Sequence, residues 1–358
     1  MRAALGLLCL QCLLLASTAH AAAVSVPPGA ATPPSSATAA PAAKPGVAAA
    51  PGSPAQQPPS LEDLLFACPT RLDHIGRVVA AVMIDGRGPF RFVVDTGANY
   101  SSISPGLAAR LRLTPSLQQA IRVTGVTGSA EVASVPIEKL QAGALVIEHT
   151  RFPVIWAPVM AGADGILGAA GLEGDRLLVD FGHNRVVITR SHGQSVPWTF
   201  TRVWATRLSG GLLSIPGQVG GVRVTAIIDT GSQHTLGNPA LYEALYARER
   251  GKGTYLAASV YGATQQVGAG KLQMAPTIDL GAIKIGGVAL VFGDFHIFKV
   301  WDLTRTPTII LGMDVLGTVK AFAIDFRHAE LAVDSQYDAF DSTAQDRDLP
   351  SSLLPRSD

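Results

Sequence analysis

Cysteine is almost absent from this sequence of 358 residues, which limits how the chain can be stabilised. Of the three cysteines, Cys9 and Cys12 lie in an N-terminal apolar run, so Cys68 is the only one in the rest of the chain. No internal disulfide is expected in the mature protein, and the fold must depend on a hydrophobic core. No cluster of His, Cys and carboxylate residues has the spacing of a metal site, and we predict no metal or other cofactor.

Charged and aromatic residues are also scarce, and the composition gives no sign of a nucleic-acid-binding protein. Charged residues make up 15% of the chain and aromatic residues 6%, and the net charge is +1, so nothing in the composition indicates a nucleic acid partner. Glycine (37 residues) and proline (24 residues) are abundant, which favours short strands and turns over long helices. The length allows two domains.

No apolar run reaches the length of an ordinary transmembrane helix, but the N-terminus has the pattern of a signal peptide. Residues 1–21 contain Arg2, an apolar run over residues 5–16 and a cleavage site between small residues. We therefore expect an exported protein, periplasmic or secreted, with no stable membrane insertion after signal cleavage. A signal that is kept as an anchor is the alternative.

An internal repeat dominates the rest of the chain, with an offset of about 134 to 145 residues. The tripeptide Asp-Thr-Gly follows an apolar run at residues 95–97 and again at residues 229–231. Three landmarks follow in the same order in both halves. A Pro-initiated helix is expected at residues 104–111 and 238–250, and an Ile-Leu-Gly strand at residues 166–168 and 310–312. An Asp-Phe-x-His turn comes last, at residues 180–183 and 325–328. Four agreements in one order indicate a duplicated lobe.

The repeat and the composition together divide the chain. Residues 22–60 are rich in Ala and Pro and are predicted to be a linker. We place the N-terminal lobe at residues 61–198 and the C-terminal lobe at residues 199–335. Residues 336–358 are polar and acidic, and we predict a disordered tail there.

The repeated aspartates are the candidate chemical groups. A carboxylate at the end of a buried strand needs hydrogen-bond partners, and the glycine after it lets the backbone come close enough to donate. If the two turns meet, Asp95 and Asp229 share a proton, so that one is a base for water and the other donates to a carbonyl oxygen. A structural role for each aspartate in its turn is the alternative.

Both halves resemble the retropepsin-like and pepsin-like aspartic proteases. In that family an apolar-apolar-Asp-Thr-Gly motif is followed by a later apolar-apolar-Gly strand, as at residues 93–97 with 166–168 and at residues 227–231 with 310–312. The resemblance spans about residues 75–335. It implies an all-β fold of duplicated pepsin/retropepsin-like β-barrel lobes with a few short helices and an active-site cleft between the lobes.

The same resemblance implies an aspartic endopeptidase that acts as a monomer on a peptide or protein substrate. It assigns Asp95 and Asp229 as catalytic, Thr96, Gly97, Thr230 and Gly231 as their support, and Gly125, Val126, Thr127 and Gly128 as the flap. From the residues of the second copy we add Ser232 as a further supporting residue and Tyr261 and Gly262 as substrate or flap residues. Two alternatives remain: a catalytically inactive peptide-binding or scaffold protein of the same fold, and a homodimer in which each lobe pairs with its copy.

The two halves differ at two positions that bear on the site. Pepsin-like flaps carry a tyrosine in the first lobe, whereas here no tyrosine occurs between residues 101 and 241 and Tyr261 lies in the second-lobe hairpin. The sequence therefore leaves open which hairpin is the flap. Ser232 follows the second triplet where Ala98 follows the first, and a hydroxyl that donates to the carboxylate would make Asp229 the more easily ionised of the pair.

Overall fold

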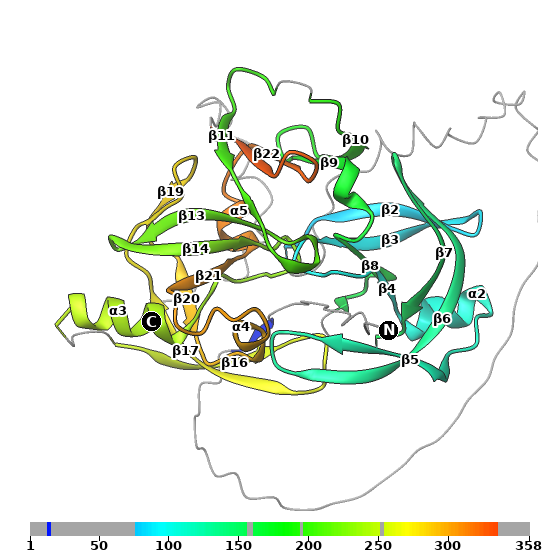
Figure 1. The fold of residues 1–358 in the computed structure, drawn as a ribbon, viewed down its shortest axis with the longest axis horizontal. Coiled ribbons are helices and arrows are strands. Elements are labelled where there is room, and N and C mark those ends of the chain that lie inside the picture. The colour runs from blue at the N-terminus through cyan, green and yellow to red at the C-terminus, as the bar shows by residue number, and fades with distance from the viewer. Residues whose placement is uncertain (1–12, 16–75, 156–159, 194–195, 251–253, 336–358) are drawn as a thin grey trace, which may run out of the picture.

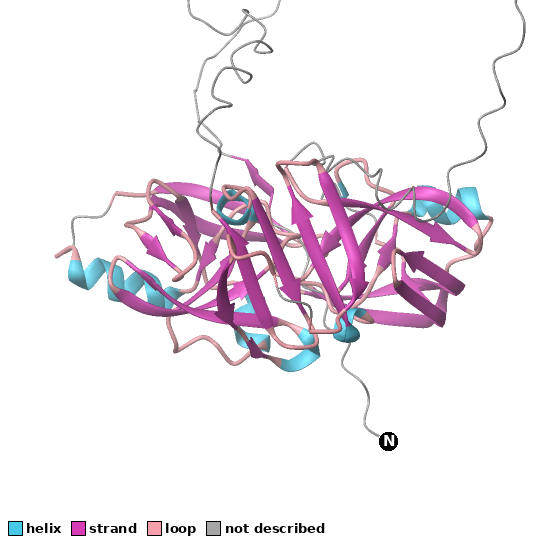
Figure 2. Ribbon diagram, turned by 90° about the horizontal axis from the view of Figure 1, so that it is seen from above, coloured by secondary structure: helices cyan, strands magenta, loops and turns pink. Residues whose placement is uncertain are grey.

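The computed structural model describes residues 13–15, 76–155, 160–193, 196–250 and 254–335. Its strands form two lobes that lie side by side (Figure 1), and helices are few and short (Figure 2). Within these ranges, no helix has the length and hydropathy needed to cross a membrane. The predicted linker and C-terminal tail lie outside the described residues, and so does the predicted signal peptide apart from one short strand.

The first lobe is built on a seven-stranded sheet, counted over the described residues. Its strand order is β4-β8-β3-β2-β6-β5, with β7 beside β6. The elements are β2 (Val79–Ile84), β3 (Arg87–Asp95), β4 (Ser102–Ile103), α2 (Pro105–Leu111), β5 (Ser116–Thr124), β6 (Ser129–Ala142), β7 (Leu145–Pro153), β8 (Gly165–Gly168) and a 3-10 turn at Leu172–Gly174.

The second lobe repeats this plan on a sheet with eleven strands in the described part of the chain. β1 (Leu13–Leu15), the described piece of the predicted signal peptide, lies antiparallel to β16 at its edge. The elements are β12 (Thr206–Arg207), a 3-10 turn at Ser209–Gly211, β13 (Leu213–Val219), β14 (Val222–Ile228), β15 (Leu236–Gly237), α3 (Pro239–Arg248), β16 (Leu256–Tyr261), β17 (Val267–Met274), β18 (Ile278–Asp279), β19 (Lys284–Ile285), β20 (Ala289–Phe292), α4 (His296–Val300), β21 (Thr308–Leu311) and α5 (Met313–Leu316).

The apolar runs before the repeated triplets are explained by burial on both faces of each strand. In β3, Phe92 and Val94 face the large core cluster, while Val93 faces a smaller one on the other side. A strand covered on both faces needs a continuous apolar run rather than an alternating pattern. In the second lobe, Ala226 and Ile228 of β14 join the large cluster in the same way.

The predicted Pro-initiated helices occur in both lobes, each with the expected cap. Ser104 Oγ accepts the backbone N–H of Leu107 at 3.1 Å before α2. Asn238 Oδ1 accepts the N–H of Leu241 at 3.0 Å before α3. In each helix the residue after the cap is proline, which has no N–H to leave without a partner.

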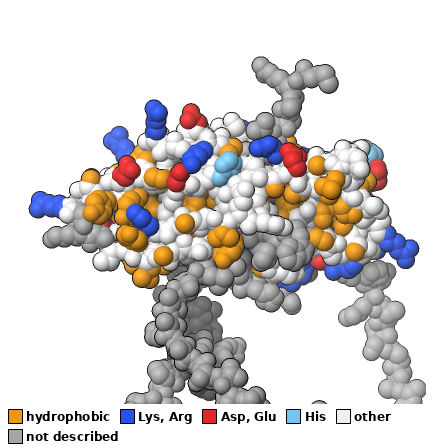
Figure 3. Space-filling model, turned by 90° about the horizontal axis from the view of Figure 1, so that it is seen from below, with side chains coloured by type: hydrophobic (Ala, Val, Ile, Leu, Met, Phe, Trp, Pro, Cys, Tyr) orange, Lys and Arg blue, Asp and Glu red, His pale blue; other side chains and the backbone are white. Residues whose placement is uncertain are grey.

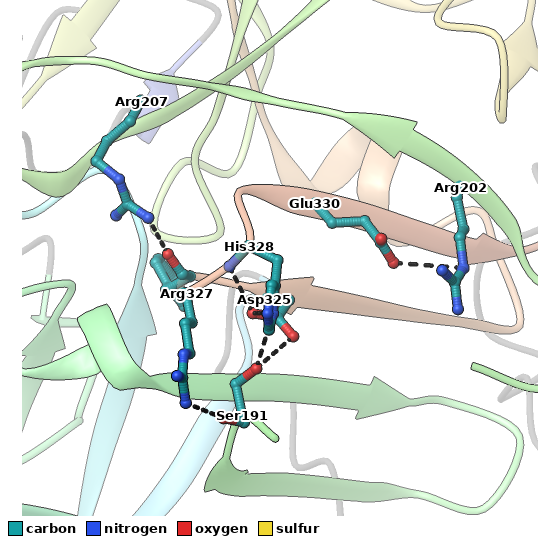
Figure 4. Close-up of polar contacts among 8 residues, drawn as sticks. Ser191, Arg202, Arg207, Asp325, Arg327, His328 and Glu330 are labelled. Atoms are coloured by element: carbon teal, nitrogen blue, oxygen red, sulfur yellow. Dashed lines mark hydrogen bonds and ion pairs between the residues drawn. The ribbon is translucent and has the colours of Figure 1, made fainter. Parts of the chain in front are cut away.

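A third sheet takes strands from both halves of the chain and joins the lobes. Its order is β10-β9-β22-β23-β11, from β9 (Asp175–Asp180), β10 (Arg185–Arg190), β11 (Thr201–Trp204), β22 (Ala321–Asp325) and β23 (Glu330–Asp334). Figure 4 shows a polar cluster at this sheet: Ser191 Oγ donates to Asp325 Oδ2 at 2.7 Å, and Arg327 donates to Ser191 O at 3.0 Å. These bonds connect the two copies of the repeat away from the triplets.

The repeated Asp-Phe-x-His segments form hydrogen-bonded turns, as predicted. Asp180 Oδ1 accepts the backbone N–H of His183 at 3.0 Å, and Asp325 Oδ1 accepts that of His328 at 2.9 Å. Each carboxylate therefore closes the turn between two neighbouring strands of the shared sheet, β9 and β10 in the first copy and β22 and β23 in the second.

Candidate active site

The two Asp-Thr-Gly turns lie at the ends of equivalent strands, one in each lobe. β3 ends at Asp95, which lies opposite Gly168 of the parallel strand β8. β14 ends at Ile228, and the next residue, Asp229, donates its backbone N–H to Leu311 O of the parallel strand β21 at 3.1 Å. The later apolar-apolar-Gly segment thus runs beside the strand that leads to the aspartate, which explains why the two motifs recur together.

Thr96 and Thr230 join the two turns by reciprocal hydrogen bonds. Thr96 Oγ1 donates to Ile228 O at 2.8 Å and accepts the N–H of Thr230 at 3.1 Å. Thr230 Oγ1 donates to Val94 O at 2.7 Å and accepts the N–H of Thr96 at 3.2 Å. Both threonines are buried, so each hydroxyl satisfies two backbone groups of the opposite lobe. The side chains of these two threonines therefore join the two lobes at the aspartate turns.

Gly97 and Gly231 lie against the carboxyl group of the opposite turn. A Cβ atom on Gly97 would overlap the carboxyl of Asp229, and one on Gly231 would overlap that of Asp95. Only glycine leaves room for the two turns to come this close. The structure therefore brings the two predicted aspartates into one site.

In each aspartate of the pair, one carboxyl oxygen accepts backbone N–H groups and the other does not. Neither aspartate has accessible surface. Asp95 Oδ1 accepts the N–H of Gly97 at 3.0 Å, and Asp229 Oδ1 accepts those of Gly231 and Ser232 at 2.9 and 3.2 Å. Within the described residues, the Oδ2 atom of each aspartate accepts no hydrogen bond from any other residue, and the two carboxyls lie close enough to share a proton. These two oxygens remain able to bind a water molecule or a substrate.

Burial and mutual repulsion separate the two ionisations. Burial raises the pKa of Asp95 well above its usual value, the charge of Asp229 raises it further, and the buried Arg77 guanidinium opposes the rise. Burial raises the pKa of Asp229 to about 6. A hydrogen bond between its carboxyl and that of Asp95, together with the backbone N–H groups of Gly231 and Ser232, limits the increase. Asp229 therefore ionises first, and above about pH 6 the pair carries one negative charge.

Ser232 acts on Asp229 through its backbone and not through its hydroxyl. Its Oγ donates to His234 O at 2.8 Å, and its backbone N–H donates to Asp229 Oδ1. The expectation that the hydroxyl donates to the carboxylate is wrong, because the backbone carbonyl of the same turn takes that donor. The difference between Ser232 and Ala98 consequently does not explain why Asp229 ionises first.

We expect Ser232→Ala to leave the acid limb of the pH–rate profile unchanged, because the N–H donor to Asp229 remains. The measurement is kcat/KM on one peptide from about pH 3 to about pH 8. Ala98→Ser, which adds a hydroxyl at the equivalent place in the first turn, is the matched comparison. An acid limb that moves to higher pH in Ser232→Ala would mean that the hydroxyl reaches the carboxylate.

The two predicted flap hairpins meet at their tips. Residues 125–128 form the turn between β5 and β6, and the second hairpin is formed by β16 and β17. The side-chain oxygens of Thr127 and Thr264 lie 3.1 Å apart, one from each tip. Tyr261 of the second hairpin packs against a first-lobe cluster that includes Val93. The tips of the two predicted flap hairpins are thus in contact across the lobes.

Two charged groups near the site were missed by sequence reasoning. Arg77 is fully buried and acts on the pKa of Asp95, but a lone arginine before a strand gives no sequence signal. Asp314 accepts both the N–H (2.9 Å) and the hydroxyl (2.6 Å) of Thr235 and lies 3.9 Å from His234 Nδ1. The first copy has Ala170 at the place of Asp314, so a residue-by-residue comparison of the two copies could have found it.

The arrangement can supply an acid and a base to the same reacting group. One carboxyl that is ionised and one that keeps its proton can take a proton from water and give one to an oxygen without a covalent intermediate. In the part of the chain that the structure describes, no group of three or more His, Cys, Asp or Glu side chains is arranged to bind a metal ion.

Two half-barrel lobes that each supply one Asp-Thr-Gly turn to a shared site define the aspartic protease class. The chain matches the aspartyl protease family model over residues 80–170 and 215–315, which together exceed half of its length. It therefore belongs to the aspartyl protease family, and the predicted resemblance and duplicated all-β fold are confirmed. No curated protein matches the chain.

Proposed function

We propose that the protein is an aspartic endopeptidase in which Asp95 and Asp229 activate a water molecule. The observation that carries this proposal is the placement of each glycine turn against the opposite carboxyl, which joins two buried carboxyls in one site. A pair with one proton and one negative charge is poised for general acid–base catalysis. Membership of the aspartyl protease family supports a peptidase activity in general.

In the proposed mechanism the two carboxyls have different roles. The Asp229 carboxylate takes a proton from the water, whose oxygen attacks the carbonyl carbon of the peptide bond, while Asp95 gives its proton to the carbonyl oxygen. The tetrahedral intermediate then collapses: its C–N bond breaks, the amine nitrogen takes up a proton from Asp229, and Asp95 recovers its proton from the hydroxyl that becomes the new carboxyl oxygen. Both aspartates return to their starting states.

We also propose a substrate class, an oligomeric state and a compartment for the protein. The substrate is a peptide or an unfolded protein segment, since an extended chain is what a site between two lobes can admit. Both halves of the dyad come from one chain, so we propose a monomer. The signal-peptide pattern of residues 1–21 supports its export to the periplasm or its secretion. Sedimentation of the purified full chain separates the monomer from the homodimer.

The test is cleavage of a peptide library by the full chain over a range of pH. We expect kcat/KM to rise with an apparent pKa near the value of about 6 that burial gives Asp229, because the singly charged pair forms only as Asp229 ionises. Activity would then be low at about pH 4 and high near neutrality.

Two outcomes contradict this proposal in different ways. Full activity at about pH 4 would mean that the pair ionises much more readily than its burial implies. No cleavage of any peptide at any pH, with peptide binding retained, would instead favour an inactive peptide-binding member of the family.

A further inference from the structure

One arginine near the candidate active site has no accessible surface. Arg77 is fully buried, whereas on the face drawn in Figure 3 the Lys and Arg side chains extend outward from the surface. A guanidinium keeps its proton inside a protein, so Arg77 brings a permanent positive charge into the interior. Burying a charge is costly unless an opposite charge lies close by. The place of Arg77 relative to the two carboxyls therefore decides what its charge does.

The strand register places Arg77 opposite Asp95. β2 and β3 are antiparallel, with Val79 opposite Val93, and the pair after it is joined by a backbone hydrogen bond of 2.9 Å. The same register, extended by one more residue, pairs Arg77 with Asp95. Side chains alternate between the faces of a strand, so both residues belong to the face of Val79 and Val93, which packs in the smaller cluster. Burial is the largest influence on the pKa of Asp95 and raises it, while the charge of Arg77 lowers it.

The second lobe has a leucine at the equivalent place. β13 and β14 are antiparallel, with Ser214 opposite Ile227. The same register, extended by two residues, pairs Leu212 with Asp229. Leu212 is fully buried and packs in an apolar cluster of the second lobe. One carboxyl of the pair therefore lies opposite a positive charge and the other lies opposite an apolar side chain.

The other charged groups around the pair come from the second lobe. Asp229 faces Asp95 from the opposite turn, and its charge adds to the effect of burial in raising the pKa of Asp95. His234 and Asp314 interact with each other: burial lowers the pKa of His234, and the charge of Asp314 opposes this. In the described part of the chain, Arg77 thus supplies positive charge on the Asp95 side of the pair.

We propose that Arg77 is a positioning residue that acts through Asp95, drawing the negative charge of the pair from Asp229 to Asp95 as the tetrahedral intermediate forms. The inference rests on the proposed function, in which ionised Asp229 takes a proton from water while Asp95 gives its proton to the carbonyl oxygen. That step leaves the negative charge on Asp95, opposite Arg77, and collapse of the intermediate returns it to Asp229. A fixed charge placed where negative charge develops lowers the barrier without having to reorganise during the reaction.

Arg77 does not reverse the order in which the two carboxyls ionise. Burial and the charge of Asp229 outweigh its effect, so Asp95 still holds its proton in the resting pair. The guanidinium instead narrows the difference between the two pKa values. A smaller difference means that less free energy is needed to move the charge from Asp229 to Asp95 during the reaction.

The test is Arg77→Met, which removes the charge but keeps a long side chain. Arg77 has no accessible surface, so we expect kcat to fall on the order of 10-fold, the equivalent of one pKa unit, with KM little changed. The alkaline limb of the pH–rate profile reports the ionisation of Asp95 and should move to higher pH by about 1–3 pH units, whereas the acid limb should move less. Arg77→Lys, which keeps a positive charge, should recover most of kcat and the wild-type alkaline limb.

Leu212→Met is the matched control, because it changes the side chain at the equivalent place in the second lobe. It should lower the stability of the protein without moving either limb of the profile. A wild-type profile in Arg77→Met, an equal movement of both limbs, or a loss of kcat that lysine does not restore overturns the inference. If Arg77→Met does not fold, Arg77→Lys decides the question: an alkaline limb displaced by one pH unit or more, at roughly the lower end of the effect of a neighbouring charge, overturns it.

Carbon-13 NMR of the aspartate carboxyl carbons gives a readout that needs no cleavage. Comparison with Asp95→Asn assigns the resonance of Asp95, whose titration should move to higher pH in Arg77→Met and stay in place in Leu212→Met. A titration of Asp95 that does not move in Arg77→Met overturns the inference. A titration that moves in a protein that cleaves no peptide would keep the action of Arg77 on Asp95 and reject the proposed function.

Discussion

Asp95→Asn and Asp229→Asn are each expected to lower kcat/KM by on the order of 10³-fold, the middle of the range for loss of a general acid or base. An asparagine keeps the shape of the carboxyl and can still accept the N–H of Gly97 or Gly231 through its oxygen. It cannot take a proton from water or give one to a carbonyl oxygen. The measurement is cleavage of one peptide at the pH optimum of the wild type.

The same variants should become more stable at neutral pH, and this distinguishes catalysis from a structural role. Burial raises the pKa of Asp229 from 3.8 to about 6, so the folded state binds its proton more tightly than the unfolded state does. That contribution to stability is complete below the unfolded pKa of about 3.9 and is lost as the pH rises through the folded pKa. Ionisation of Asp229 thus costs the folded protein about 3 kcal/mol near neutrality.

Asp229→Asn removes this cost because the amide does not ionise. Its Tm should exceed that of the wild type by several degrees near pH 7, at roughly 2–4 °C per kcal/mol for a protein of this size, and the difference should fade at about pH 4. Asp279→Asn is the control: Asp279 is a half-exposed residue of β18 that lies 3.5 Å from Lys284 Nζ, and its substitution should leave activity unchanged and alter Tm little. Equal activity in all variants would end the protease proposal, while a lower Tm with full activity would make Asp229 a structural turn residue.

The fold could be predicted from the sequence because the motifs that indicate its strands and helices are short and occur twice. Continuous apolar runs before Asp95 and Asp229 predict buried strands, and Ser104-Pro105 and Asn238-Pro239 predict helix starts; the structure contains all of these. Each signal depends on residues a few positions apart, and its recurrence in the second copy made coincidence improbable.

The parts that sequence reasoning missed depend on contacts between distant residues. The hydroxyl of Ser232 had two acceptors within reach, and only the path of the turn decides that it bonds to His234 O. The meeting of Thr127 with Thr264 depends on how two lobes close against each other, and no pattern within either hairpin encodes that. The role of Arg77 could not be predicted for the same reason, since its guanidinium acts on the pKa of Asp95, a residue of another element, through space.

Thr96→Val and Thr230→Val should each lower the free energy of unfolding by about 2–6 kcal/mol. Valine has the shape of threonine but no hydroxyl, so Thr96→Val leaves Ile228 O and the N–H of Thr230 buried without their partner. Thr230→Val does the same to Val94 O and the N–H of Thr96. Each buried backbone group that loses its partner costs roughly 1–3 kcal/mol.

Urea unfolding measures the change, and Thr→Ser at each position, which keeps the hydroxyl, should recover most of the loss. Thr318→Val, at an exposed threonine that bonds within its own turn, should cost no more than about 0.5 kcal/mol. The pH–rate profile of the valine variants shows whether the threonines also set the position of the two carboxyls. If the threonines hold the carboxyls together, looser turns let water reach the pair, the rise in the pKa of Asp229 shrinks, and the acid limb moves to lower pH. Reduced stability with an unmoved acid limb would mean that the threonines join the lobes but that Gly97 and Gly231 alone set the spacing of the carboxyls.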